Sequence, residues 1–267
     1  ALAGRIPVAH ALAAFLTMRA FEFIRTDIAL PNLPVKLIGG VPGFLSEANG
    51  PTHQAIEDVA LMRTIPNMRI FCPADADEMV LGLPHILKDP NPWYVRYNAS
   101  KRMVSHSEEF IQGKSELLAD GGDVAIISYG LLVAEALWAR DILESQGIFT
   151  RVINLRTIRP LDEDAILRAA RETRLIVTLE DHFLTGGLYS ITAELFLRAR
   201  VLCDVMPVAF EDRWFKPALL HDAIRYEGFA GDQLAERISH RLRQSTAGPK
   251  LKRLVEVSRD AKLSEAQ

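Results

Sequence analysis

The chain has 267 residues, of which 49% are hydrophobic and 24% charged, so it can bury one large domain or two of ordinary size. A formal net charge of −3 argues against a nucleic-acid-binding domain, because such domains carry a clustered basic excess. With only Cys72 and Cys203, a disulfide framework and a four-cysteine zinc site are excluded. The absence of a secretion signal and of any ~20-residue apolar run predicts a cytoplasmic protein that does not enter membranes.

In the first half, apolar runs rich in β-branched residues alternate with helical patterns. This alternation predicts α/β layers on a mostly parallel sheet. The expected helices cover residues 9–28, 54–63 and 77–87, and the expected strands cover residues 35–38, 69–72 and 93–97. A polar stretch of mixed charge and weak periodicity follows, and we assign residues 101–114 to a linker.

The second half repeats the alternation with clearer signals. The expected strands cover residues 124–127, 151–155, 175–179 and 202–208, and the expected helices cover residues 132–145, 162–171, 188–199 and 232–242. We therefore expect an α/β protein of two domains, each a mostly parallel sheet covered by helices. Their predicted ranges are 1–100 and 115–245, and a charged tail takes up 246–267.

One polar segment stands apart from this framework. Gly50-Pro-Thr-His-Gln54 predicts a turn, and Thr52 is a suitable N-cap for the helix expected at 54–63. His53 would then lie at a helix N-terminus, where the helix dipole disfavours the imidazolium and leaves a neutral ring that can exchange a proton near pH 7. A capping histidine with a structural hydrogen bond fits the same residues. We find no motif for a dinucleotide, a P-loop phosphate or a metal ion.

The whole string from Phe44 to Met68 resembles the pyrimidine-binding domain of transketolases, through G-P-T-H-Q, E-D-V-A-L-M-R and I-P-N-M. Pro73-Ala-Asp75 and Pro92-Trp-Tyr-Val-Arg96 extend the likeness. The second half is similar to the transketolase C-terminal domain in residues 125–130, 152–161 and 180–187. The resemblance covers nearly all of the chain, from Ala1 to about Leu242, and implies a thiamine diphosphate enzyme.

The resemblance implies the following roles. His53 takes part in proton transfer and in binding a substrate hydroxyl, and Phe15 stacks on the aminopyrimidine of the cofactor. Leu12 stands where another aromatic wall residue is usual, and Asn49 replaces an acidic residue that faces the substrate. The arginine that binds substrate phosphate aligns with Ala99, so we expect either a replacement from nearby, by Lys101 or Arg102, or an acceptor that is not an ordinary sugar phosphate. The resemblance assigns His182 to packing and dimer contacts and Arg96 to a structural role.

Two parts of the family's site lie outside this sequence. The catalytic glutamate belongs about a dozen residues before Ala1, and the domain that binds the diphosphate and Mg²⁺ is also missing. Because the chain has no initiator Met, we expect it to begin inside a longer protein. A large partner chain would hold the diphosphate and the metal, since no metal-binding cluster is legible here.

These features favour the small subunit of a split transketolase, which moves a two-carbon ketol unit from a ketose to an aldose. Its substrates would be sugars or sugar phosphates, and a homodimer of this chain would form the core of the enzyme. Two alternatives remain open. One is a related thiamine diphosphate enzyme, either deoxyxylulose-phosphate synthase or a 2-oxo acid dehydrogenase β chain. The other is a non-catalytic, transketolase-like assembly module.

Overall fold

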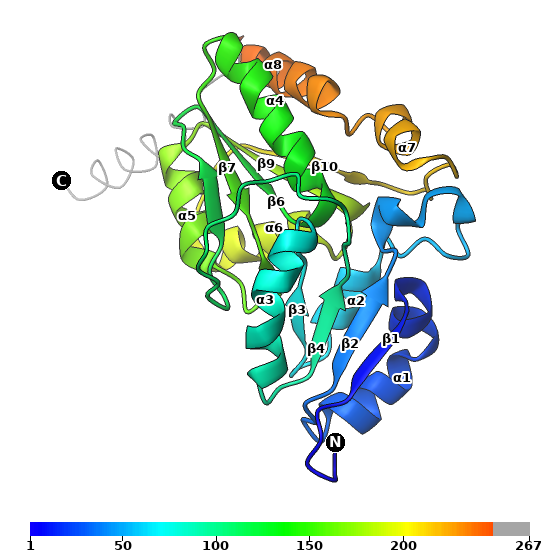
Figure 1. Ribbon diagram of the computed structural model, residues 1–267. Coiled ribbons are helices and arrows are strands. Elements are labelled where there is room, and N and C mark those ends of the chain that lie inside the picture. Colours follow the sequence, from blue (N-terminus) through cyan, green and yellow to red (C-terminus); the bar gives the residue numbers. More distant parts are fainter. Residues whose placement is uncertain (248–267) are drawn as a thin grey trace, which may run out of the picture.

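The computed structural model describes residues 1–247, which form two five-stranded sheets covered by helices (Figure 1). The strand order is β1-β2-β4-β3-β8 in the N-terminal sheet and β10-β9-β6-β7-β5 in the C-terminal sheet. All pairings are parallel except those of the edge strands β8 and β5. The predicted fold class is therefore confirmed.

The N-terminal sheet is built mainly from the first half of the chain. Its strands are β1 (Val8–Leu12), β2 (Lys36–Gly40), β3 (Arg69–Phe71) and β4 (Trp93–Arg96). The π-helical turns η1 (Phe15–Arg19) and η2 (Ile24–Ala29) flank the short α1 (Phe21–Phe23), and α2 (Asp58–Arg63) and α3 (Ala76–Lys88) follow.

The single helix predicted over residues 9–28 is wrong at its start. Residues 8–12 form β1, which pairs in parallel with β2 so that Leu12 lies opposite Gly40. Alanine-rich sequence favours helix locally. Here the free edge of β2 supplies backbone partners that outweigh that propensity, and most side chains of β1 stay exposed.

The C-terminal sheet comprises β5 (Glu116–Ala119), β6 (Val124–Ser128), β7 (Thr150–Asn154), β9 (Leu175–Phe183) and β10 (Val205–Phe210). Its helices are the 3-10 turn η4 (Gly130–Leu132), α4 (Val133–Ser145), α5 (Glu163–Glu172), α6 (Leu188–Ala199), α7 (Leu220–Tyr226) and α8 (Gly231–Ala247). Most of these strands and helices lie within a few residues of their predicted ranges. β9 runs four residues beyond its predicted end, and β5 and α7 were not predicted.

The two halves of the chain share their interior. One apolar cluster joins Val59 and Met62 of α2 to Ile127 of β6 and Leu188 of α6. In addition, β8 (Thr157–Arg159) comes from the second half and pairs antiparallel with β3 of the N-terminal sheet. The domains therefore meet through a continuous core.

Within the described chain, residues 97–115 contain neither helix nor strand. This segment connects β4 to β5. None of the described helices is both long and apolar enough to cross a membrane. The predicted charged tail lies outside the described residues from position 248 onward.

Candidate functional site

The G-P-T-H-Q segment forms a tight turn in the loop between β2 and α2. The amides of His53 and Gln54 donate to the carbonyl of Gly50 at 3.0 and 3.1 Å, and Gly50 has a φ of 77° that favours glycine. The loop closes where the amide of Gly43 donates to the carbonyl of Ala55 at 2.9 Å. Residues 43–55 are thus a compact unit at the carboxyl edge of the N-terminal sheet.

The expected place of His53 at a helix N-terminus is wrong. The helix α2 begins only at Asp58, five residues after His53, because the amides of residues 53 and 54 are used in the turn. Thr52 does not cap α2 either, since its hydroxyl lies 2.8 Å from Nδ1 of His53. The ring of His53 is therefore oriented by Thr52, and a bound molecule would meet Nε2.

The structure brings His53 and Phe15 together. Their ring centroids are 5.3 Å apart and the rings are tilted by 59°. Phe15 begins η1 directly after β1, following the buried pair Ala13 and Ala14, and both aromatic rings are half-buried. The pairing of β1 with β2 places the start of η1 beside the start of the loop. An apolar ring face thus lies next to an imidazole that can give or take a proton.

The other predicted contacts to cofactor and substrate flank this pair in the sequence. Leu12 is half-buried at the end of β1 and lies in register with Gly40. Asn49 is exposed on the same loop as His53, and its side-chain amide donates to the carbonyl of Ser46 at 2.8 Å. Arg19 places its guanidinium 4.6 Å from the centre of the Phe15 ring, a cation–π contact that the sequence analysis did not anticipate.

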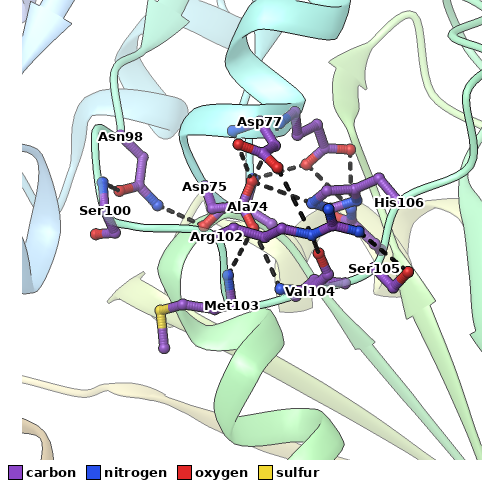
Figure 2. A network of polar contacts seen from close by, with 12 residues as sticks. Ala74, Asp75, Asp77, Asn98, Ser100, Arg102, Met103, Val104, Ser105 and His106 are labelled. Atoms are coloured by element: carbon purple, nitrogen blue, oxygen red, sulfur yellow. Dashed lines mark hydrogen bonds and ion pairs between the residues drawn. The ribbon is translucent and has the colours of Figure 1, made fainter.

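Lys101 and Arg102 lie on the segment that connects the two sheets, and both are exposed. Figure 2 shows Arg102 lying over the start of α3. Its guanidinium donates to the carbonyl of Val104 and the hydroxyl of Ser105, each at 3.2 Å, and approaches Asp77 at 3.6 Å. These partners belong to the segment itself and to α3.

The segment that connects the two sheets is also held in place by a buried polar network around His106, which is drawn in Figure 2 and was not predicted from the sequence. His106 lies between two carboxylates, with Nδ1 at 2.8 Å from Glu116 and Nε2 at 3.2 Å from Asp75. Asp75 also caps α3 and accepts the amides of Met103 and Val104. Burial alone would lower the pKa of His106, but the hydrogen bond to Glu116 and the nearby carboxylates raise it.

Glu78, His106 and Glu116 bring possible metal-binding atoms within 4.8 Å of one another. However, the guanidinium of Arg156 lies 2.7 Å from an oxygen of each glutamate. Arg156 therefore compensates the charge of these carboxylates, and His106 forms a hydrogen bond with Glu116. The cluster stabilises the connecting segment as an ion-pair network, which local sequence could not reveal because its members come from four distant elements.

Comparison with known proteins bears on this geometry. Residues 1–103 match the family model of the transketolase pyrimidine-binding domain, and residues 113–223 match that of the transketolase C-terminal domain. A putative transketolase C-terminal section from Methanocaldococcus jannaschii is 32% identical over 248 residues, or 91% of this chain and 78% of that protein. The chain belongs to the transketolase family. The resemblance found in the sequence is thereby confirmed.

Other members of the family are also similar. A 6-deoxy-6-sulfo-D-fructose transketolase subunit from Clostridium sp. (strain MSTE9) is 41% identical over 193 residues, which cover 72% of this chain and 60% of that one. A 1-deoxy-D-xylulose-5-phosphate synthase from Dictyoglomus thermophilum is 34% identical over 242 residues, 88% of this chain and 38% of its own length. The chain therefore spans less than two thirds of these two relatives.

Among solved structures, a split gene transketolase described as an inactive beta4 tetramer superposes with a TM-score of 0.80 and 33% identity, covering 90% of this chain and 77% of that one. Transketolase from Pichia stipitis, in complex with sedoheptulose 7-phosphate, superposes with a TM-score of 0.72 at 21% identity, over 90% of this chain and 34% of that chain. The similarity to the Pichia stipitis enzyme shows that the two proteins share a fold.

Proposed function

We propose that this chain is the small subunit of a split transketolase. With a large partner chain, it would transfer a two-carbon ketol unit from a ketose to an aldose acceptor. The observation that carries the proposal is the pairing of His53 with Phe15 at the carboxyl edge of a transketolase pyrimidine-binding sheet, 5.3 Å apart. The relative named as a separate C-terminal section and the split-gene tetramer described as inactive both support an enzyme divided between chains.

The residues around His53 fit the aminopyrimidine half of thiamine diphosphate. The half-buried ring of Phe15 offers a face for the aminopyrimidine, and Leu12 forms the neighbouring wall. The cofactor, when bound, supplies the stabilised carbanion that the transfer needs. This chain would orient the pyrimidine, and His53 would move a proton at Nε2 and bind a substrate hydroxyl with help from Asn49.

We assign the diphosphate and Mg²⁺ to the partner chain. Mg²⁺ prefers oxygen ligands, whereas the metal-capable cluster among the described residues contains His106 and is already paired with Arg156. Calorimetry on the lone chain should therefore detect no tight binding of thiamine diphosphate with Mg²⁺, and the reconstituted pair should bind it and turn over. Tight, Mg²⁺-dependent binding by the lone chain would refute the division.

His53→Ala tests the catalytic assignment. We expect a folded subunit whose reconstituted enzyme is slower by about 10²–10⁴-fold, the range for losing a positioned acid–base group. The matched control is His221→Ala, since that histidine is 80% exposed on α7. Full turnover of the cofactor-loaded His53→Ala enzyme would contradict the role, and an equal loss in the control would point to a general defect.

The substrate is expected to be a sugar or sugar phosphate whose anionic group is bound differently from that of ordinary transketolases. Ala99 stands at the expected position of the phosphate-binding arginine, and Lys101 or Arg102 would take over part of that role. One relative is named for a sulfonated sugar. Comparing kcat/KM for phosphorylated, sulfonated and uncharged sugars would decide among these classes.

A second candidate function is deoxyxylulose-phosphate synthesis, which the similarity to a synthase from Dictyoglomus thermophilum favours. Detecting 1-deoxy-D-xylulose 5-phosphate, rather than a product of ketol transfer, from the reconstituted enzyme would support it.

We further propose a cytoplasmic enzyme with a homodimeric core of this chain, domains at 1–100 and 115–245, and a linker at 101–114. Sedimentation of the lone chain tests the dimer.

A further inference from the structure

We propose that Asp181 and His182, in the C-terminal domain, are positioning residues for His53. They hold the loop of residues 43–57 and the first turn of α2 from across the domain boundary, so that this domain acts in the reaction without touching the substrate. The inference rests on the proposed function of His53. It gives a role to the four-residue extension of β9 that the sequence analysis did not predict.

Three hydrogen bonds, one between backbone groups and two from backbone amides to side chains of β9, join the residues around His53 to the end of β9. The Oδ2 atom of Asp181 accepts the amide of Phe44 at 3.1 Å, and the amide of Phe183 donates to the carbonyl of Ile56 at 2.7 Å. Nε2 of His182 accepts the amide of Ala60 at 3.2 Å. The three bonds therefore restrain the loop on both sides of His53.

A buried arginine connects the same two elements by charge. Arg96 at the end of β4 donates to Oδ2 of Asp58 at 3.0 Å and to Oδ1 of Asp181 at 2.5 Å. Asp58 also accepts the hydroxyl of Tyr94 at 2.7 Å. The side chains of all three ions are at most 3% exposed, so removing Arg96 would leave two buried carboxylates without their counter-charge.

The loop fits closely against Asp181. Gly43 has a φ of 54°, and a Cβ built at this position would lie 1.9 Å from Oδ2 of Asp181. Only glycine permits both the backbone conformation and the approach of the carboxylate. The close approach of the Gly43 backbone to Asp181 therefore restrains the loop against β9.

Side chains of the loop also enter the C-terminal domain. Phe44 and Ile56 are fully buried members of its apolar core. Gln54, the neighbour of His53, donates from its side-chain amide to the carbonyl of Phe215 at 2.8 Å. His53 therefore lies between residues whose anchors are in the other domain, and those anchors set its distance from Phe15.

His182 can accept a hydrogen bond at Nε2 because its ring is neutral. Burial lowers its pKa to about 4, so the ring is neutral at pH 7. The ring lies 2.6 Å from the carbonyl of Phe183 through Nδ1, which therefore carries the hydrogen and leaves Nε2 as the acceptor for Ala60. The ring thus satisfies an amide in the first turn of α2, a helix that has no side-chain N-cap of its own.

The test uses the full chain reconstituted with its partner. His182→Leu removes the acceptor, and His182→Gln places a carbonyl oxygen near the position of Nε2. We expect His182→Leu to lower kcat by about 10–100-fold, since a 1 Å misplacement can cost ~10²-fold, and His182→Gln to restore most of it. His221→Leu is the matched control. Wild-type kcat in His182→Leu would overturn the inference.

A double-mutant cycle separates positioning from general damage. If His182 acts through His53, His182→Leu should cost less than about twofold in the His53→Ala background, because the group it positions is gone. Equal losses in both backgrounds would overturn the inference. If His182→Leu does not fold, Gln54→Met replaces it in the cycle with the same expectation.

A readout without activity distinguishes this inference from the proposed function. In the isolated chain, the amides of His53 and Gln54 should exchange with solvent at least about tenfold faster in His182→Leu than in wild type or His221→Leu, because local opening becomes easier. Unchanged exchange would overturn the inference. If the wild-type pair has no transketolase activity, the proposed function fails, and this measurement alone decides the role of His182.

Discussion

Phe44 is the side chain through which the His53 loop enters the core of the C-terminal domain. It is fully buried, and its ring lies 5.2, 5.1 and 5.2 Å from the rings of Phe210, Phe215 and Phe229. A Phe→Ala change in a core costs about 3–5 kcal/mol, and three aromatic neighbours place this site at the upper end of that range. Because the two halves of the described chain share one core, the relevant unit has about 250 residues, and such a loss lowers its Tm by roughly 10–20 °C.

Urea unfolding of Phe44→Ala, followed by circular dichroism, measures this loss. Phe149→Ala is the control, because Phe149 is 60% exposed and should change the unfolding free energy by no more than about 0.5 kcal/mol. The reconstituted Phe44→Ala enzyme should also lose turnover at temperatures where it remains folded. A stability loss below about 1 kcal/mol, or one equal to the control's, would refute the reasoning that the loop is anchored in this core.

Three further predictions concern buried histidines and the missing arginine. Because the pKa of His182 is about 4 when folded and near 6.5 when unfolded, the unfolded chain binds the extra proton between these values, and wild-type stability should fall by up to about 3 kcal/mol as pH drops through this window. Urea titrations should show a flatter fall for His182→Gln, and parallel profiles would contradict the assignment. The pKa of His106 is instead raised in the folded chain, so its stabilisation is complete below pH 6.5 and is lost as pH rises through the folded pKa; His106→Asn should remove that dependence in the same titrations. If the unfolding free energy of His106→Asn still fell with rising pH as in wild type, this assignment would be contradicted. Finally, Ala99→Arg should raise the kcat/KM preference for phosphorylated over uncharged aldoses by about tenfold or more, and an unaltered ratio would argue that the substrate's anionic group lies elsewhere.

The sequence predicted the layers of the fold because buried parallel strands such as β6 are read from unbroken apolar runs, here residues 124–127. It failed where tertiary partners override local preference. Residues 8–12 form a strand only because the edge of β2 lies beside them. The three residues of β8 and the four of β5 are too short to show a period that distinguishes strand from loop.

The candidate site was predictable only in part. The resemblance selected His53 and Phe15, and the structure brings their rings together. The position of His53 within its turn was missed, because the Gly50 carbonyl competes with α2 for the same amides. The anchors Asp181 and His182 lie over 120 residues away, and no local pattern links them to the loop.

The pairing of β8 with β3 also bears on the order in which the molecule is made. The N-terminal sheet lacks its edge strand until Arg159 has been synthesised, and the guanidinium of this residue then donates to the carbonyls of Arg63, Ile65 and Pro66. Domains usually fold during synthesis in order from the N-terminus. A nascent chain that ends at residue 103 would contain the residues that match the pyrimidine-binding family model and would still present β3 as an open edge. The N-terminal sheet is therefore complete only once residues 157–159 of the second half are available to pair with β3.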